Sequence, residues 1–283
     1  MKKIYFSLLA ITLMATPAAA AVCSYGSVYG SYLSYGGSDL KDDGWSSTAY
    51  LNVGDCNANA VEVGLTTTTI HYNTLPDLDQ KDLTIAYTNT NQLLSNQTLR
   101  AGFHYIDSDD VLTDKGKIYF LKDTYAVYND WNTGLEIDYS SYRHSSTKLG
   151  VLQLTPHYGM FLSVLNRRIY AETRLHYIHK DAKVGESIDN FYSMEQVLSL
   201  KEGDMDYKLN GWAGQQAFAV KNSGFVVYNL ADRYLGGLGA EIGYSFANQM
   251  RLGLNINRQW LEHNGTNDRA TLTMTTLTLG GRF

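Results

Sequence analysis

The histidine, serine and acidic side chains are the residues that could carry out acid–base or nucleophilic chemistry. Arg143-His144-Ser145-Ser146 places a hydroxyl beside an imidazole in the sequence, the pair that a serine hydrolase uses. Neighbours on an extended strand point to opposite faces, so this adjacency does not predict a contact. Parts of a His–Asp pair occur in two further stretches, His104 with Asp107 and Asp109, and His176 with His179 and Asp181. Histidines at strand ends are usually solvated polar groups, and we expect no enzyme and no catalytic residue.

Acidic residues gather in three short stretches, residues 39–43, 77–82 and 107–110. Their carboxylates could collect divalent cations through oxygen ligands, but they lack the ligand spacing of a calcium loop, and solvated loop surface is the simpler explanation. The sequence also has no zinc cluster, nucleotide fold or Gly-rich phosphate loop. It therefore implies neither a metal site nor a cofactor.

The elements that must position these residues are strands. Residues 271–283 read TLTMTTLTLGGRF, in which Leu277, Leu279 and Phe283 share one face while small polar side chains occupy the other. This alternation is typical of a strand in a membrane-spanning β-barrel. The segment resembles the closing strand of bacterial outer-membrane β-barrel proteins, a porin-like superfamily in which a C-terminal Phe is read by the barrel-assembly machinery. The resemblance extends to no narrower family.

The rest of the sequence repeats this pattern in segments of roughly ten to fifteen residues separated by polar turns. It predicts an all-β fold, a transmembrane antiparallel β-barrel of about 14 strands, with 12 as the alternative. Residues 206–219 make the weakest strand. Residues 226–246 keep one register throughout and are interpreted as a single long strand that projects beyond the membrane. An even strand number puts both termini in the periplasm, with short connections there and longer ones outside, such as residues 107–116, 180–189 and 262–268.

Two residues do not fit the pattern. Asp123 falls on the lipid face between Leu121 and Tyr125, where a carboxylate is costly unless it lies near an interface or a bulge shifts the register. Pro156 removes a hydrogen-bond donor from the ladder of the eighth strand.

With the apolar face outward, the other face must line the lumen. Most of its ionisable residues are predicted to line a pore: Glu62, Arg100, His104, Lys122, Glu136, Asp138, Arg168, Glu172, Arg174, His176, Glu195, Lys208, Glu241 and Arg251, with Asp206 beside them. Charged groups need water or partners, so a water-filled pore is the functional interpretation and a lumen closed by ion pairs is the alternative. The near balance of signs predicts weak ion selectivity.

Cys23 and Cys56 flank the first predicted hairpin. If the first strand leaves the periplasm and the second returns, both cysteines lie at the periplasmic end, where an oxidising compartment lets them form a disulfide. Two unpaired thiols are the alternative.

The start of the sequence indicates export. Met1-Lys2-Lys3, the apolar residues 4–14 and Ala18-Ala19-Ala20 form a signal peptide over residues 1–20, which leaves residues 21–283 as one barrel domain. The whole chain has 23 basic and 28 acidic residues, and loss of Lys2 and Lys3 makes the mature charge about −7, which argues against nucleic acid as a partner. No later stretch is long and apolar enough for a spanning helix. A soluble secreted β protein could share this composition but would not need the terminal Phe pattern.

These patterns favour a porin-like channel in the outer membrane of a Gram-negative bacterium, with passive transport of small hydrophilic solutes. The alternative is a barrel that acts through its loops as an adhesin, receptor or scaffold, and a hydrolase is a distant third class. The expected partners are outer-membrane lipid and lipopolysaccharide, the assembly machinery and the solutes, and a monomer is favoured.

Overall fold

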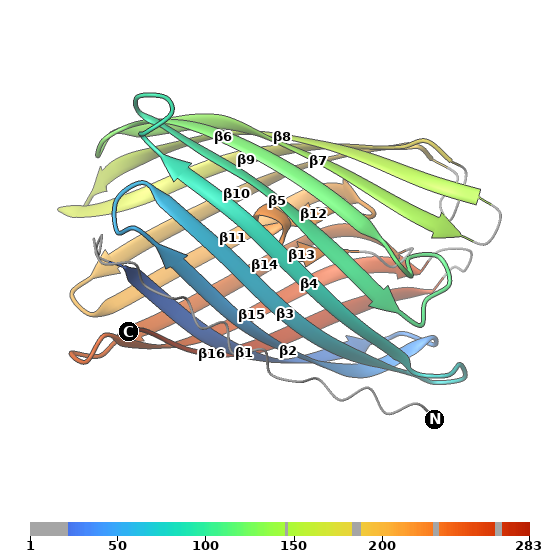
Figure 1. The fold of residues 1–283 in the computed structure, drawn as a ribbon. Helices are drawn as coiled ribbons and strands as arrows, with labels where there is room; N and C mark the ends of the chain where they lie inside the picture. Colours follow the sequence, from blue (N-terminus) through green and yellow to red (C-terminus); the bar gives the residue numbers. More distant parts are fainter. Residues whose placement is uncertain (1–21, 145–146, 183–187, 229–231, 264–267) are drawn as a thin grey trace.

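A computed structural model describes residues 22–144, 147–182, 188–228, 232–263 and 268–283. Alternation of apolar and polar side chains produces long antiparallel strands, and fourteen of them close into a barrel in which β1 pairs with β16 (Figure 1). The strands of the barrel wall are β1 (Cys23–Gly36), β2 (Lys41–Gly54), β3 (Asn59–Tyr72), β4 (Leu78–Thr90), β5 (Gln97–Ser108), β6 (Lys117–Val127), β7 (Trp131–His144), β8 (Thr147–Val164), β9 (Arg167–Lys180), β10 (Asn190–Glu202), β11 (Met205–Gln216), β14 (Asp232–Ser245), β15 (Met250–His263) and β16 (Arg269–Arg282). The prediction of 14 strands is confirmed, and the alternative of 12 is wrong.

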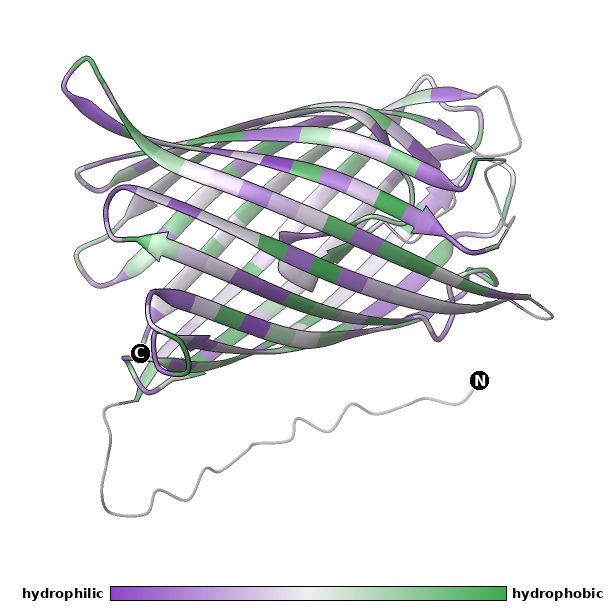
Figure 2. Ribbon diagram, turned by 90° about the horizontal axis from the view of Figure 1, so that it is seen from above, coloured by the Kyte–Doolittle hydropathy of each residue, from purple (hydrophilic) through white to green (hydrophobic). Residues whose placement is uncertain are grey.

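The outer surface of the wall is apolar. Bands of hydrophobic and hydrophilic residues alternate along the strands (Figure 2). Large apolar side chains of the predicted outward faces are exposed, for example Leu65, Leu121, Leu175, Leu209 and Leu277. The intervening side chains are mostly buried or half-buried, because they point into the barrel. Among the described residues no helix is long and apolar enough to cross a membrane.

Because neighbouring strands are antiparallel, successive connections lie alternately at the two ends of the barrel. At the end that holds Cys23 and Arg282, called here the disulfide end, the connections are short; β8 and β9, for example, are joined by Leu165 and Asn166, both with positive φ as a tight hairpin turn requires. The opposite end, called here the loop end, carries the longer connections, including those between β5 and β6 and between β9 and β10.

The interpretation of residues 226–246 as one long strand is wrong. Only β14 (Asp232–Ser245) belongs to the wall, whereas β12 (Val220–Lys221), the short 3-10 helix η1 (Asn222–Gly224) and β13 (Val226–Val227) form a separate hairpin. A bulge in β14 between Tyr234 and Gly236 reverses the faces, so that Tyr234 is buried inside while Leu238 is exposed outside.

The two irregular residues behave differently. Asp123 pairs with Leu99 and Leu135 in unbroken ladders, so no bulge shifts β6, and Asp123 stays on the outer face four residues before that strand ends. Pro156 faces Leu135 on β7 but has no partner on β9, as expected for a residue without a backbone N–H.

Candidate functional site

The candidate functional site is the lumen and the chain that crosses it. Residues 217–228, called here the inner segment, leave the end of β11 and fold back into the barrel. The segment contacts β5 through Arg100, β8 through Gln153 and β10 through Glu195. Strands so far apart around a closed sheet can be reached together only from inside, and Figure 1 shows the segment within the ring of strands.

A side-chain amide on β8 fixes the first part of the inner segment. Nε2 of Gln153 donates to the carbonyl oxygen of Val220 at 2.7 Å, and the Val220 amide donates to Oε1 of Gln153 at 2.9 Å. Val220 thus donates one hydrogen bond and accepts one, as a backbone residue does in a pair of antiparallel strands. The amide of Tyr228 donates to the carbonyl of Ala219 at 2.8 Å and closes the hairpin. The inner segment thus has regular structure of its own but is not a strand of the wall.

A buried ion pair anchors the turn of this hairpin to β10. Nζ of Lys221 lies 2.9 Å from Oε2 of Glu195, and each side chain is about one-tenth exposed. The same carboxylate lies 3.2 Å from Nε2 of His176 and 4.0 Å from Nη1 of Arg174. Lys221 also lies 5.5 Å from the ring centre of Trp212. A charge held in such a place depends on its partner, because it has little contact with water.

Arg100 holds the opposite side of the turn. Its guanidinium binds Glu62 with Nε at 3.0 Å and Nη2 at 3.2 Å, and Nη1 donates to the carbonyl of Ser223. The guanidinium lies between two rings, 5.2 Å from the centre of Phe120 and 5.3 Å from that of Phe225. The planar guanidinium can bind a carboxylate through two nitrogen atoms and stack between aromatic rings at the same time, which the ammonium group of Lys cannot do.

A glycine in the wall and a glycine in the inner segment let the two pack closely. A Cβ on Gly64 would lie 2.7 Å from the Phe225 ring, so that ring packs directly against bare backbone of β3. Gly224 has φ +90°, a conformation that side-chain-bearing residues rarely adopt, and it contacts the Phe120 ring. A bulkier residue at either position would prevent this packing.

The loop end of the lumen is filled by apolar side chains. Ala217, Phe218, Ala219 and Val220 are almost fully buried. They pack with inward residues of several strands: Ile106, Ile118, Tyr142, Leu149, Val151, Ile178 and Phe191. A second buried cluster consists of Leu33, Tyr35, Ile70, Leu78, Trp212, Tyr234, Leu261, Ala270 and Leu272. The lumen of this half is therefore a packed core.

The lumen towards the disulfide end contains a cavity of about 440 Å³. Its polar and charged lining comes from β9, β10, β11 and β14: Arg168, Tyr170, Ser199, Lys201, Asp206, Lys208 and Glu241. Phe161, Leu200 and Tyr207 complete the lining. Water and small molecules can occupy a space of this size, with the charged groups available as hydrogen-bond partners.

Most of the predicted pore-lining residues form pairs. Glu62 binds Arg100, Lys122 lies 3.8 Å from Glu136, Glu172 lies 2.6 Å from Arg174, and Arg251 binds both Asp206 and Glu241. His104 contacts Thr84 at 2.7 Å and lies 3.4 Å from Asp82. Arg168 stacks over Phe161 at 4.5 Å, Lys208 lines the cavity, and both carboxylate oxygens of Asp138 are buried without a hydrogen bond among the described residues. The pairing is more extensive than an open pore requires.

Sequence reasoning missed the inner segment and its anchors. The predicted strand over residues 206–219 ends at Gln216 in the structure, and Ala217 is fully buried in the lumen, as is Gln153. Lys221 lies outside every predicted strand face. The available signal was the polar Lys221-Asn222-Ser223-Gly224 stretch, which interrupts the apolar pattern with residues that favour turns.

The residues considered for catalysis or metal binding make other contacts. His104 is buried in the wall, Asp107 pairs with Lys115, and Asp181 accepts the Gly150 amide at 2.7 Å. Ser145 and Ser146 lie outside the described residues. The part of the chain that is described holds no group of three or more acidic, His or Cys side chains arranged for a metal ion.

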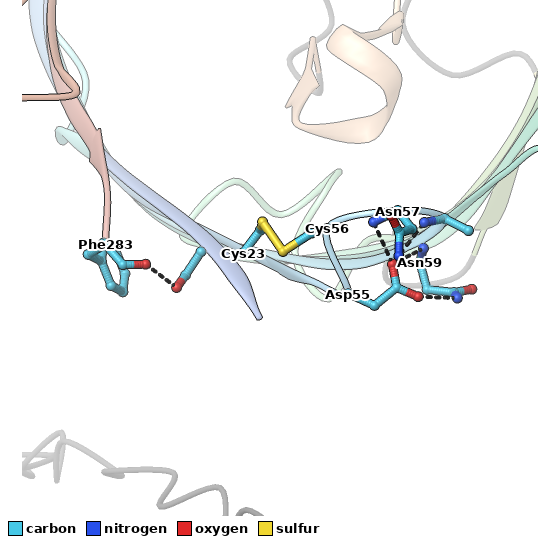
Figure 3. Close-up of a disulfide and its surroundings, with 8 residues drawn as sticks. Cys23, Asp55, Cys56, Asn57, Asn59 and Phe283 are labelled. Carbon is cyan, nitrogen blue, oxygen red and sulfur yellow. Dashed lines mark hydrogen bonds between the residues drawn. A yellow bond between two sulfur atoms is a disulfide. The ribbon is translucent and has the colours of Figure 1, made fainter. Parts of the chain in front are cut away.

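The disulfide predicted between Cys23 and Cys56 is confirmed, with a Cα–Cα distance of 5.0 Å (Figure 3). It joins the start of β1 to the turn between β2 and β3. Asp55 orders this turn by accepting the Asn57, Ala58 and Asn59 amides. These bonds, that of Asn59 first, hold the pKa of Asp55 well below its usual range. Nearby, Oγ of Ser24 donates to the carbonyl of Phe283 at 2.7 Å.

Loss of the disulfide should destabilise the barrel without opening the lumen. It closes a loop of 33 residues, and the side chains that hold the inner segment lie elsewhere in the wall, so the double variant Cys23→Ala/Cys56→Ala should lower the free energy of unfolding by about 2–4 kcal/mol. Denaturant unfolding of the two proteins in detergent measures the difference. Equal midpoints would show that the strand pairing of β1 already provides the constraint.

Comparison with family models and with curated proteins finds no match. Solved structures do match. The toluene transporter TbuX of Ralstonia pickettii superposes with a TM-score of 0.60 at 8% identity, over 92% of this chain and 90% of that one. The monoaromatic hydrocarbon channel CymD gives 0.57 at 7% identity, over 92% and 88%. A bacterial polysaccharide outer membrane secretin gives 0.55 at 10% identity, over 92% and 98%.

The fold is that of a bacterial outer-membrane β-barrel protein. The match covers nearly the whole described wall, so the predicted fold class is confirmed. At such low identity it extends to architecture alone, and function has to be argued from the lumen of this chain.

Proposed function

We propose that the protein is an outer-membrane channel for small hydrophilic solutes, and that the inner segment controls their passage. The observation that carries the proposal is the construction of the lumen. A cavity of about 440 Å³ with several charged side chains in its lining lies towards the disulfide end, and a hairpin that forms no ladder with the wall is held in the lumen by side chains such as Gln153, Glu195 and Arg100. Structures with the same fold are described as a toluene transporter and a monoaromatic hydrocarbon channel, which supports a channel role.

The charges of the wall favour hydrophilic solutes with little selection by sign. The proposed pore-lining set contains six carboxylates, six Lys or Arg side chains and two histidines: Glu62, Glu136, Asp138, Glu172, Glu195 and Glu241 against Arg100, Lys122, Arg168, Arg174, Lys208 and Arg251, with His104 and His176. Opposite charges alternate around the lumen, so neither cations nor anions gain a continuous path of favourable potential.

Planar-bilayer recording of the purified protein tests the channel. We expect stepwise conductance with brief openings and little preference between cation and anion, because the inner segment fills the lumen while closed and the wall charges balance. The control is the same preparation without protein, and the far-ultraviolet circular dichroism spectrum verifies folding. Bilayers that stay silent with folded protein, both native and with a shortened inner segment, would exclude the channel.

A barrel that acts through its loops is the second candidate, and the filled lumen is the observation that favours it. The apolar packing around Phe218 would serve as a permanent core in such a protein. Binding to a surface or partner that is lost when the loops are trimmed, together with absent conductance, would support this function.

The same proposal includes the location and the partners. We infer a monomer in the outer membrane with both termini in the periplasm and with lipid and lipopolysaccharide around the apolar wall. The residues proposed for recognition by the barrel-assembly machinery, Leu277, Leu279 and Phe283, are exposed on the outside. The proposed signal peptide, residues 1–20, lies outside the described residues.

A further inference from the structure

A polar cluster at the loop end has a geometry that the channel does not use. It joins Ser38 in the turn between β1 and β2, His263 at the end of β15 and Asp232 at the start of β14. Oγ of Ser38 lies 2.9 Å from Nε2 of His263, and Nδ1 of His263 lies 2.8 Å from Oδ1 of Asp232. Three segments far apart in the sequence thus place a hydroxyl, an imidazole and a carboxylate in one hydrogen-bonded row.

We propose that Ser38, His263 and Asp232 form a hydrolytic site for carboxylic esters, held in a blocked state by Asp268. A hydroxyl beside an imidazole that is itself oriented by a carboxylate is the arrangement that activates a serine nucleophile. With the imidazole proton on Nδ1, that nitrogen donates to Asp232, and Nε2, which lies 2.9 Å from Oγ of Ser38, accepts the Ser38 proton once Asp268 has moved away. The site is at the rim, so its test is independent of conduction through the lumen.

The base and its carboxylate are firmly positioned. His263 and Asp232 are buried, whereas Ser38 is half-buried and within reach of solvent. The second oxygen of Asp232 lies 2.5 Å from Nζ of Lys41, which also lies 5.4 Å from the ring centre of Tyr35. This fixed carboxylate orients the imidazole ring, which is the role of the acidic residue in a Ser-His-Asp triad.

A carboxylate oxygen occupies the position suited to an oxyanion. Oδ2 of Asp268 accepts three hydrogen bonds, from the amide of Asp39 at 3.1 Å, from that of Leu40 at 3.3 Å and from the hydroxyl of Ser38 at 3.2 Å. Two converging amides beside the nucleophile are the donors that stabilise the negative oxygen of a tetrahedral intermediate. Asp268 fills this position with its own negative oxygen, so an ester carbonyl can enter only when Asp268 moves away.

The turn also restrains the nucleophile. The amides of Leu40 and Lys41 donate to Oγ of Ser38 at 3.1 and 2.9 Å. Attack requires one of these bonds to open, because the oxygen must direct a lone pair at the substrate. Movement of Asp268 frees the Asp39 amide, and the Leu40 amide, which is shared between Asp268 and Ser38, becomes available when its bond to Oγ of Ser38 also opens. The proposed resting state is therefore inactive.

The reaction balances with water as the only co-reactant. Oγ of Ser38 bonds to the ester carbon while its proton passes to Nε2 of His263, and the bond to the alcohol oxygen then breaks as that oxygen takes the proton. Water attacks the resulting acyl-serine and gives its proton to Nε2. The bond to Oγ breaks, Oγ recovers the proton, and the products are one carboxylic acid and one alcohol.

Membrane lipid and solution are the two sources of esters at this rim, because His263 lies on the inward face of β15 together with Leu261. Trp260 is exposed on the outer face of β15 three residues before His263, and exposed Trp residues mark the level of the membrane interface. At about 3.3 Å per residue, the cluster lies within roughly 10 Å of that level. A soluble ester has the same chemistry, and the two sources are distinguished in the experiment.

The experiment combines covalent labelling with hydrolysis. Full-length protein in detergent is treated with a fluorophosphonate, which replaces its fluoride by a serine oxygen, and the labelled peptide is identified by mass spectrometry. We expect labelling of Ser38, roughly tenfold or more faster in Asp268→Gly because the oxyanion position is vacated. His263→Gln should slow it about 100-fold. Ser108→Ala is the matched control, since Ser108 accepts the Asp110 amide in a similar turn at the same end.

Hydrolysis by Asp268→Gly is then measured with phospholipid vesicles and with p-nitrophenyl butyrate. Cleavage of either that disappears in Ser38→Ala supports the site; activity on vesicles identifies lipid as the source, and activity on the soluble ester alone excludes it. Circular dichroism verifies that each variant is folded. If Ser38 stays unlabelled in folded native protein and in folded Asp268→Gly, the row of hydrogen bonds only ties the loops together and the proposal is wrong.

Discussion

Replacement of residues 218–228 by Gly-Ser-Gly should raise the single-channel conductance several-fold and prolong the openings. The inner segment crosses the lumen, and its buried side chains fill the loop end, whereas β11 and β14 pair with each other in the wall without it. A hairpin connection needs only a few residues, so the shorter linker can still join the two strands. Single-channel recording in planar bilayers measures the change.

The matched control shortens a connection that stays outside. Replacement of residues 74–76 between β3 and β4 by Gly-Gly removes exposed residues at the same end and should leave conductance unchanged. Equal conductance of the native protein and the variant with the shortened inner segment, both folded, would mean that the segment does not obstruct the path.

The variant Glu195→Gln should open the channel more often without changing the size of each step. It leaves the buried ammonium of Lys221 without its carboxylate, and loss of one partner of a buried ion pair costs about 3–5 kcal/mol. This penalty falls on the closed arrangement, in which Lys221 is buried. Because about 1.4 kcal/mol corresponds to a tenfold change in an equilibrium, open probability should rise by tenfold or more. Long recordings of single channels give this probability.

Two further variants isolate the pair. Glu241→Gln makes the same charge change in the lumen but leaves Arg251 bound to Asp206, so it should have little effect. The double variant Glu195→Gln/Lys221→Gln removes both charges and should restore much of the closure, because no unpaired charge is then buried. An open probability of Glu195→Gln equal to that of Glu241→Gln would exclude the ion pair as an anchor.

The wall could be predicted from the sequence because every strand faces two different environments. Leu65, Leu121 and Leu277 are exposed as expected, and Glu62, Arg100 and Glu195 pair inside. Period-two alternation also places the strand ends well enough to give the number of strands. The pairing of Cys23 with Cys56 follows from the same count, since the two ends of the first hairpin meet.

The inner segment could not be predicted in the same way. The alternation of apolar and polar residues around Phe218 or Tyr234 is the same whether the apolar side chain faces lipid or a packed lumen. The bulge near Gly236 adds one residue and reverses the faces, which alternation cannot reveal. The partners of Val220 and Lys221, Gln153 and Glu195, become neighbours of the segment only after the wall has closed.

The seam between β1 and β16 has a consequence for biogenesis. Tyr25 pairs with Arg282, and Gly36 with Thr271. The first strand of the barrel to be synthesised therefore has an unpaired edge until the last strand has been synthesised. Until then β1 and β16 each expose a row of unpaired amides and carbonyls, which attract strands of other chains. Nascent copies of this protein should therefore depend on a chaperone that shields these two edges until the barrel closes.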